Sequence, residues 1–204
     1  MTTAYLFDKS NRTNTMSSQR QAIAIIHSFL AKYQSLVGKP LFTVNPDKVI
    51  IQLFYYAPTE SISNASITAL GDALTRCWGR TVELRLIRLN HSALDSSIFA
   101  QYLTANGGKY SFNRILDMLK GRLPTVVSEG SVTDRSVASH ITGVKIQLSG
   151  RLTTQRSSPR QTVQAGRLGS SAKGPYGLVD YSQHTSKNKL GAFTMKVWIS
   201  QQSK

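Results

Sequence analysis

The sequence predicts an α+β fold in which alternating helices and strands precede a pair of helices and an antiparallel sheet. Three observations indicate this class. Helical and strand patterns alternate in the first half, two adjacent helical patterns occupy residues 93–105 and 109–119, and two regularly alternating strands follow them. We expect a polar tail at residues 1–17, a first domain at 18–90 and a second domain at 91–204.

The first domain is expected to run helix, strand, helix, strand. Apolar residues recur at helical spacing over residues 18–37, and Gly38-Lys39-Pro40 ends that pattern. The segment KVIIQLFYY at residues 48–56 is rich in β-branched and aromatic residues, which is typical of a strand. A moderate helical pattern follows at residues 61–78 and an alternating strand at 81–89.

In the second domain, Asn106-Gly107-Gly108 separates the two helices, and Gly121 and Pro124 close the second one. A polar loop is expected at residues 123–141, and strands are expected at residues 144–149 and 192–200. The intervening residues 152–190 contain few apolar residues and many Ser, Gly, Arg and Lys, so they indicate no firm element.

Both strands of the second domain carry apolar residues on one face and a lysine on the other. Val144, Ile146 and Leu148 alternate with Lys145, and the apolar residues of 192–200 alternate with Lys196 and Trp198 in the same way. The two helices can cover the apolar face, which leaves a basic face suited to phosphates. The alternative is that both lysines only keep that face soluble. Trp198 has two interpretations: it stacks on a base, or it packs beneath a loop or a neighbouring protein.

The net charge of +15 is concentrated in the second domain. Residues 1–134 carry 14 Lys and Arg against 9 Asp and Glu, whereas residues 135–204 carry 11 against one, a net +10. Such self-repulsion favours a polyanionic partner. No apolar run reaches the length of a spanning helix and no basic amphipathic helix dominates, so we expect nucleic acid and no membrane.

Nothing in the sequence indicates catalysis or a metal site. The single cysteine, Cys77, cannot form a disulfide framework, and the four histidines are scattered without ligand spacing. The acidic residues form no recognisable pair for metal-assisted hydrolysis. We therefore expect no enzyme, no cofactor and no small-molecule substrate.

The second domain contains an ordered series of motifs that resembles one family. Gly143-Val-Lys-Ile with Ser149-Gly-Arg-Leu comes first, Gly166-Arg167 and Asp180-Tyr181 follow, and Lys196-Val-Trp-Ile ends the series. Order and approximate spacing match the C-terminal domain of the universal third protein of the small ribosomal subunit over about sixty residues, and the two helices before the strand also match.

The resemblance implies a structural, rRNA-binding constituent of the head of the small subunit, beside the mRNA entry channel. The implied partners are small-subunit rRNA, mRNA and the tenth and fourteenth proteins of that subunit. Gly150 would allow a tight turn beside phosphates, or would be an ordinary strand-end glycine. The expected RNA-binding residues are Lys145, Arg151, Arg156, Arg160, Arg167, Lys173, Lys187, Lys189 and Lys196.

The first half of this family is a KH domain of type II, whose Gly-x-x-Gly loop clamps single-stranded RNA. The strands and the helix of residues 48–89 fit such a module, but the loop position has the sequence APTESISN at residues 57–64, without glycine and with Glu60. We therefore expect a degenerate KH-like domain with little clamp function.

The helix at residues 109–119 departs from the family in a second way. Bacterial members carry basic residues there that line the mRNA channel, and among the matching positions only Arg114 is basic here. Nearby basic residues partly substitute in this interpretation, so the expected mRNA-facing set is Lys109, Arg114, Lys120 and Arg122. We therefore expect this chain to bind mRNA more weakly than its bacterial relatives do.

The N-terminus lacks a secretory or transit signal. Together with the divergence, this favours a mitochondrial, fungal-type member, while the sequence leaves a chloroplast or bacterial origin open. The alternative function is a free RNA-binding factor for splicing or mRNA that reuses a KH-like module.

Overall fold

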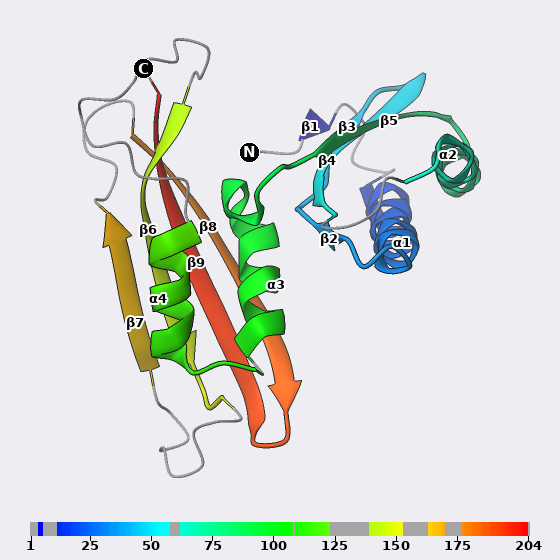
Figure 1. Ribbon diagram of the computed structural model, residues 1–204. Helices are drawn as coiled ribbons and strands as arrows, with labels where there is room; N and C mark the ends of the chain where they lie inside the picture. Colours follow the sequence, from blue (N-terminus) through cyan, green and yellow to red (C-terminus); the bar gives the residue numbers. More distant parts are fainter. Residues whose placement is uncertain are drawn as a thin grey trace. The chain divides into compact units, whose positions relative to one another are not determined.

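The computed structural model describes residues 4–5, 12–57, 62–107, 109–122, 139–152, 163–169 and 177–203. The chain divides into two compact units, unit 1 (Met1–His91) and unit 2 (Ser92–Lys204), and each has its own cluster of buried apolar side chains. Each unit combines helices with a sheet, so the architecture is mixed (Figure 1).

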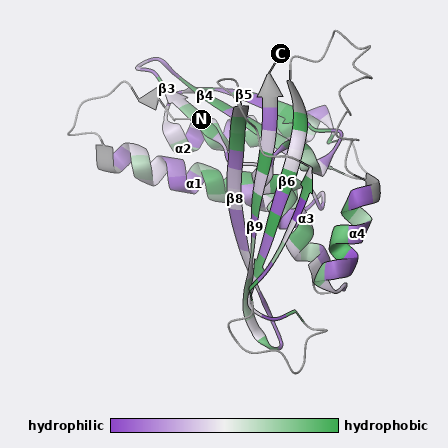
Figure 2. Ribbon diagram, turned by 90° about the vertical axis from the view of Figure 1, so that its left-hand side faces the viewer, coloured by the Kyte–Doolittle hydropathy of each residue, from purple (hydrophilic) through white to green (hydrophobic). Residues whose placement is uncertain are grey.

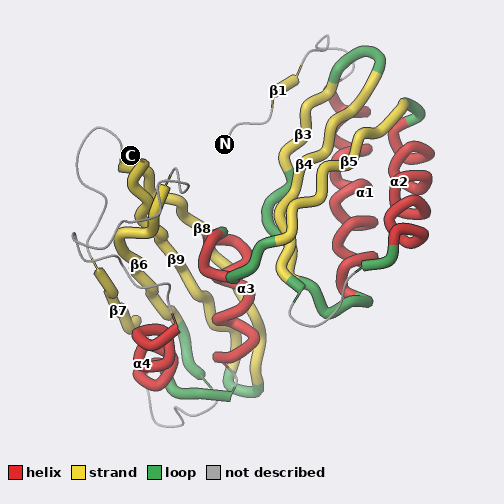
Figure 3. Tube along the Cα trace, turned by 45° about the horizontal axis from the view of Figure 1, so that its top comes forward, coloured by secondary structure: helices red, strands yellow, loops and turns green. Residues whose placement is uncertain are grey.

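Unit 1 is a mixed sheet with two helices on one side (Figure 3). Strand β4 is central, because β2 and β3 pair with it antiparallel, β5 pairs with it parallel, and β1 extends the sheet beside β3. The parallel β4–β5 pair needs a crossover, which α2 supplies. The elements of unit 1 are β1 (Ala4–Tyr5), α1 (Arg12–Ala31), β2 (Leu36–Val37), β3 (Leu41–Val44), β4 (Lys48–Tyr56), α2 (Asn64–Trp78) and β5 (Thr81–Arg88).

Local signals set the limits of α2. The Ser63 hydroxyl accepts a hydrogen bond from the Ser66 N–H at 3.4 Å, and Gly79 ends the helix in the left-handed region with φ of 62°. Helix α1 begins at Arg12, six residues before the expected Ser18, so residues 12–17 of the expected polar tail are helical. The apolar pattern starts only at Ala22, and the polar first turns of α1 therefore gave no amphipathic signal.

Unit 2 is a four-stranded antiparallel sheet in the order β7-β6-β9-β8, with two helices on one face (Figure 1). Within unit 2, no described helix or strand lies over the other face. Its elements are the 3₁₀ turn η2 (Ser92–Leu94), α3 (Ser96–Gly107), α4 (Phe112–Arg122), β6 (Ser139–Ser149), β7 (Val163–Gly169), β8 (Gly177–Asn188) and β9 (Gly191–Ser203).

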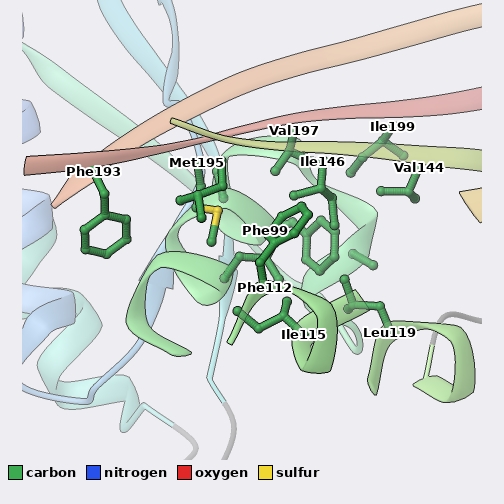
Figure 4. Packing of buried hydrophobic residues seen from close by; sticks show 14 of the residues in the cluster. Phe99, Phe112, Ile115, Leu119, Val144, Ile146, Phe193, Met195, Val197 and Ile199 are labelled. Carbon is green, nitrogen blue, oxygen red and sulfur yellow. The ribbon is translucent and has the colours of Figure 1, made fainter. Parts of the chain in front are cut away.

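The core of unit 2 lies between the sheet and the helices. Phe99 from α3 and Phe112 and Ile115 from α4 point toward Ile146 and Val197 of the sheet (Figure 4). The predicted apolar faces are confirmed, because Val144, Ile146, Leu148, Phe193, Met195, Val197 and Ile199 are all buried. Burial of a side chain of this size contributes about 1.5–3 kcal/mol, which makes this seam the main support of unit 2.

The segment 152–190 contains two strands that the sequence did not indicate, β7 and β8. Among the described strands, each of the two has a neighbour on one side only, so few of its side chains are buried and its pairing rests mainly on backbone hydrogen bonds. Of the expected 123–141 loop, residues 139–141 belong to β6, and residues 123–138 lie outside the described residues.

Strand β6 contains a β-bulge at Thr142. The pairing with β9 shifts between Ile141 and Gly143, and Thr142 is the extra residue, with its hydroxyl donating to the Ser200 carbonyl at 3.2 Å. Ile141 is therefore buried in the same core as Val144 although three positions separate them. The bulge keeps both ends of β6 in contact with the helices.

None of the described helices is both long and apolar enough to span a membrane.

Candidate nucleic-acid interface

The face of the unit 2 sheet opposite α3 and α4 collects the basic residues; we call it the open face. Polar and apolar residues alternate along β6 and β9, as Figure 2 shows, and their polar set lies on this face. From β7 to β8, the open face carries Val163, Ala165, Arg167, Gly143, Lys145, Gln147, Ser149, Thr194, Lys196, Trp198, Tyr181, Gln183, Thr185 and Lys187.

One row crosses all four strands of the open face, and we call it the central row. The strand register places Arg167 opposite Lys145, Lys145 opposite Trp198, and Trp198 opposite Tyr181. The Lys145 Nζ lies 4.9 Å from the centroid of the Trp198 ring, a cation–π contact. On the other side of Trp198, the Tyr181 ring lies 5.1 Å away, centroid to centroid, with 34° between the planes. Trp198 is thus packed between two side chains of its own sheet, and its two expected roles stay predictions.

Neighbouring rows add polar and basic groups. Lys196 lies opposite Gln147 and Gln183, and the Tyr181 hydroxyl donates to the Gln183 Oε1 at 3.1 Å. The hydroxyls of Thr185 and Thr194 share a hydrogen bond of 2.9 Å. The result is a polar surface whose hydroxyls and amides are already oriented by their neighbours.

The described carboxylates of unit 2 lie away from the open face. The Asp180 Oδ2 accepts from the Ser96 N–H at 3.0 Å, and the Asp95 Oδ1 accepts from the Ile98 N–H at 2.8 Å, so both acids satisfy donors at the first turn of α3. Asp117 is on α4, paired with Lys120. Among the described residues, the cations of the open face therefore have no carboxylate beside them.

In two dipeptides of the sequence motifs, the two residues lie on opposite faces of the sheet. In Asp180-Tyr181, Asp180 faces α3 while Tyr181 stands in the central row. In Gly166-Arg167, Gly166 faces α4, where a Cβ would lie 2.5 Å from the Leu116 methyl groups, and Arg167 stands in the central row. Since successive side chains of a strand point to opposite faces, each pair supports the helix layer and the open face at once.

The structure brings four of the nine expected RNA-binding residues onto the open face: Lys145, Arg167, Lys187 and Lys196. Lys189 lies in the β8–β9 turn. Arg151 follows β6 next to that turn, because the Asn188 Nδ2 donates to the Arg151 carbonyl at 2.8 Å. Arg156, Arg160 and Lys173 lie outside the described residues.

Gly150 has a structural reason to be glycine. Its φ is +102°, and a Cβ there would lie 2.7 Å from the Ala192 carbonyl oxygen and 3.0 Å from the Phe193 Cα. Close approach of two backbones therefore excludes a side chain at this strand end, and the presence of phosphates beside it stays a prediction.

The expected mRNA-facing residues lie on the helix side of unit 2, away from the open face. The Arg114 guanidinium lies 5.2 Å from the centre of the Tyr110 ring, and the Lys120 Nζ pairs with the Asp117 Oδ1 at 3.0 Å. Lys109 is exposed in the turn before α4, and the side chain of Arg122 is outside the described residues. The structure thus separates the two expected sites.

Sequence reasoning missed Tyr181 and Gln183 as members of the open face. The signal that could have found them is the spacing from the Asp180-Tyr181 motif, but it required knowing that β8 pairs with β9. Nothing resembling a catalytic or metal site appears among the described residues, where no cluster of three potential metal ligands occurs. His184 is on the helix side of β8, and its burial lowers its pKa.

Three similarities to known proteins are found. A family model described as mitochondrial ribosomal protein (VAR1) matches residues 35–202. "Small ribosomal subunit protein uS3m" of Mycosarcoma maydis is 33% identical over 189 residues, covering 82% of this chain and 68% of that protein. "Small ribosomal subunit protein uS3" of a Picosynechococcus strain is 23% identical over 172 residues, covering 80% of this chain and 64% of that protein.

Proposed function

Since the chain belongs to the VAR1 family of mitochondrial ribosomal proteins, we propose that it is a structural constituent of the small subunit of the mitochondrial ribosome and that its open face lies against ribosomal RNA. Proteins of this family are components of a ribosome and not enzymes, in agreement with the expectation from the sequence. The expectation of a mitochondrial member, which came from the divergence of the sequence, is confirmed, because the matching family and the relative from Mycosarcoma maydis are both mitochondrial ribosomal proteins.

The open face is the observation that carries the RNA part of the proposal. Lys145 and Arg167 stand directly opposite each other on β6 and β7, an arrangement of like charges that destabilises a sheet. Lys187 and Lys196 add two more cations, and no described carboxylate shares the face. A polyanion laid on the sheet removes this repulsion and gains counterion release for each phosphate that it places beside a cation.

The position of the protein within the subunit is proposed from the family resemblance. It places the chain in the head, beside the channel through which mRNA enters, next to the tenth and fourteenth proteins. Two of the four expected mRNA-facing cations are already engaged, Arg114 with Tyr110 and Lys120 with Asp117. The Asp117 carboxylate beside Lys120 supports a weak grip on mRNA, because it repels the phosphates that this lysine would attract.

Unit 1 has the role of a degenerate KH-like module in this proposal. The β4–α2–β5 crossover with a parallel strand pair, preceded by α1 and the antiparallel β3, is compatible with it. Residues 58–61 of the expected clamp loop lie outside the described residues. Glu83 is held by Lys48 at 3.1 Å and by Arg85, whose hydrogen bonds lower the pKa of this carboxyl group, so part of the positive charge of unit 1 is internally neutralised.

The test is sedimentation of the native protein from a mitochondrial lysate through a high-salt gradient, with and without nuclease. Co-migration with small-subunit rRNA at high salt, abolished by nuclease treatment, is expected of an integral ribosomal protein. Release at moderate salt into a small complex would contradict the proposal and favour the free RNA-binding factor. A variant in which both Lys145 and Arg167 are replaced by glutamine should be released from rRNA at a lower salt concentration, because it neutralises fewer phosphates.

A further inference from the structure

Tyr181 differs from the other aromatic residue of the open face. We propose that its ring is a stacking platform for one unpaired nucleobase, so that the open face binds an RNA segment containing a looped or bulged nucleotide and not only a regular duplex. This inference rests on the proposed function, and it adds the kind of RNA that the open face binds. It is argued from the ring surfaces of the central row that remain exposed.

Trp198 is engaged from both neighbouring strands. From β6, the Lys145 Nζ lies 4.9 Å from the centre of its ring, and from β8 the Tyr181 ring lies 5.1 Å away, centroid to centroid. Its side chain is accordingly only partly exposed. The role of Trp198 is to hold both neighbours in position, and a base that stacked on it would have to displace one of them.

Tyr181 is the outermost side chain of the central row. It lies on β8, which has no described strand on its outer side, and 41% of its surface is exposed. The ring is nevertheless fixed, by contact with Trp198 on the inner side and by the hydrogen bond from its hydroxyl to Gln183 at 3.1 Å. An exposed aromatic ring that is already immobilised loses little conformational entropy when a base stacks on it.

The charges of the same row suit the phosphates that flank such a base. Neighbouring strands are about 4.8 Å apart, so Lys145 stands about 10 Å and Arg167 about 14 Å from Tyr181 across the sheet. Lys196 stands one row along β9 from Trp198, beside Gln183. The row thus runs from an aromatic edge to a cationic edge, the combination by which sheet surfaces hold unpaired RNA: bases stack on rings and cations follow the backbone.

A regular duplex cannot use this arrangement. Its bases are stacked on one another and present no free π-face, whereas Lys145, Arg167 and Lys196 can contact the phosphates of any RNA. The ring of Tyr181 should therefore discriminate between RNAs with and without an unpaired base, and the cations should not.

The experiment uses the full chain and two fluorescent probes, a short RNA duplex with one bulged 2-aminopurine and the same duplex without the bulge. Fluorescence anisotropy gives the affinities at several salt concentrations between about 50 and 200 mM. The variants are Tyr181→Leu, which removes the ring, Tyr181→Phe, which restores it without the hydroxyl, and Lys145→Gln with Arg167→Gln, which removes charge. Circular dichroism and thermal unfolding check that each variant is folded.

We expect Tyr181→Leu to weaken binding of the bulged probe by about 5- to 100-fold, the range for loss of one base–aromatic stack, with little effect on the unbulged probe. Its salt dependence should stay unchanged, the phenylalanine should restore most of the affinity, and quenching of the 2-aminopurine should disappear with the leucine alone. The charge variants should weaken both probes and reduce the salt slope by about one for each phosphate that is no longer neutralised.

The outcomes separate the two proposals. Equal affinity of wild type and Tyr181→Leu for the bulged probe, with weaker binding in the charge variants, would overturn the stacking inference while leaving the rRNA-binding face intact. Wild-type affinity for both probes in all of the variants would overturn both, because the open face would then not be the RNA surface. Weaker binding of the bulged probe alone in the leucine variant, rescued by phenylalanine, supports the inference.

Discussion

Replacing Gly150 with alanine should destabilise unit 2 through backbone strain and close contact together. The φ of +102° costs an L-residue about 1–2 kcal/mol. The new Cβ would lie 2.7 Å from the Ala192 carbonyl oxygen and 3.0 Å from the Phe193 Cα, and these are backbone atoms that cannot rotate away. Overpacking of this kind costs a further ~1–3 kcal/mol, and alanine regains ~0.4–1 kcal/mol by restricting the unfolded chain. The net loss in the free energy of unfolding should be about 2–4 kcal/mol.

Urea unfolding followed by tryptophan fluorescence can measure this loss. The chain has two tryptophans, Trp78 in unit 1 and Trp198 in unit 2, so a Trp78→Phe background makes the signal report on unit 2 alone. Gly191→Ala is the matched control, because its φ of +124° is also positive but no heavy atom lies within 4 Å of its Cβ position. The control should lose only the strain, about 1–2 kcal/mol, less the same ~0.4–1 kcal/mol that alanine regains by restricting the unfolded chain. Equal losses in the two variants, or a Gly150→Ala protein as stable as its background, would refute the role of the close approach.

Three further predictions concern a helix cap, a half-buried histidine and the outer side of α4. Asp180→Ala should cost about 0.5–2 kcal/mol in the unfolding of unit 2, because the Ser96 N–H loses its acceptor; a loss no larger than that of Asp117→Ala would contradict it. Burial lowers the pKa of His184 below its usual 6.5, so the unfolded chain binds more protons and the thermal midpoint of unit 2 should fall as the pH drops below about 6.5; a His184→Gln protein with the same pH dependence would argue against this. Arg114→Ala should barely change mitochondrial translation through structured mRNA in a reporter assay, and a large defect would show that this residue grips mRNA.

Within unit 2, the sequence predicted most accurately the strands whose two faces differ strongly in polarity. In β6 and β9 every second residue is apolar and buried, so alternation alone identified the core face and placed Lys145 and Lys196 opposite it. The edge strands β7 and β8 were not predicted, because an edge strand buries few apolar side chains. On the helix side of β8, for example, the positions are occupied by Ser182 and His184 and not by aliphatic residues. Their pairing partners lie elsewhere in the chain, which no local pattern contains.

The sequence predicted the basic residues of the candidate site but not how they are arranged on the sheet. Lys145, Arg167, Lys187 and Lys196 were identified singly as phosphate contacts, whereas their common face depends on the registers of three strand pairs. The central row joins residues from positions 145, 167, 181 and 198, and the middle position of Trp198 decides that its ring is covered while that of Tyr181 is free. Such a distinction arises only from the assembled sheet.

Because of the bulge at Thr142, the effect of deleting one residue from β6 depends on where in the strand that residue lies. Deleting any one residue from Ile146 to Ser149 would reverse the faces of all residues that precede it in the strand, so Lys145 and Val144 would exchange sides. Deleting Thr142 instead restores plain alternation, with Ile141 still toward the helices and Gly143 toward the open face. One position of this strand can therefore change the length of the chain without changing which residues meet the core, and sequences that differ by one residue there can share the same open face.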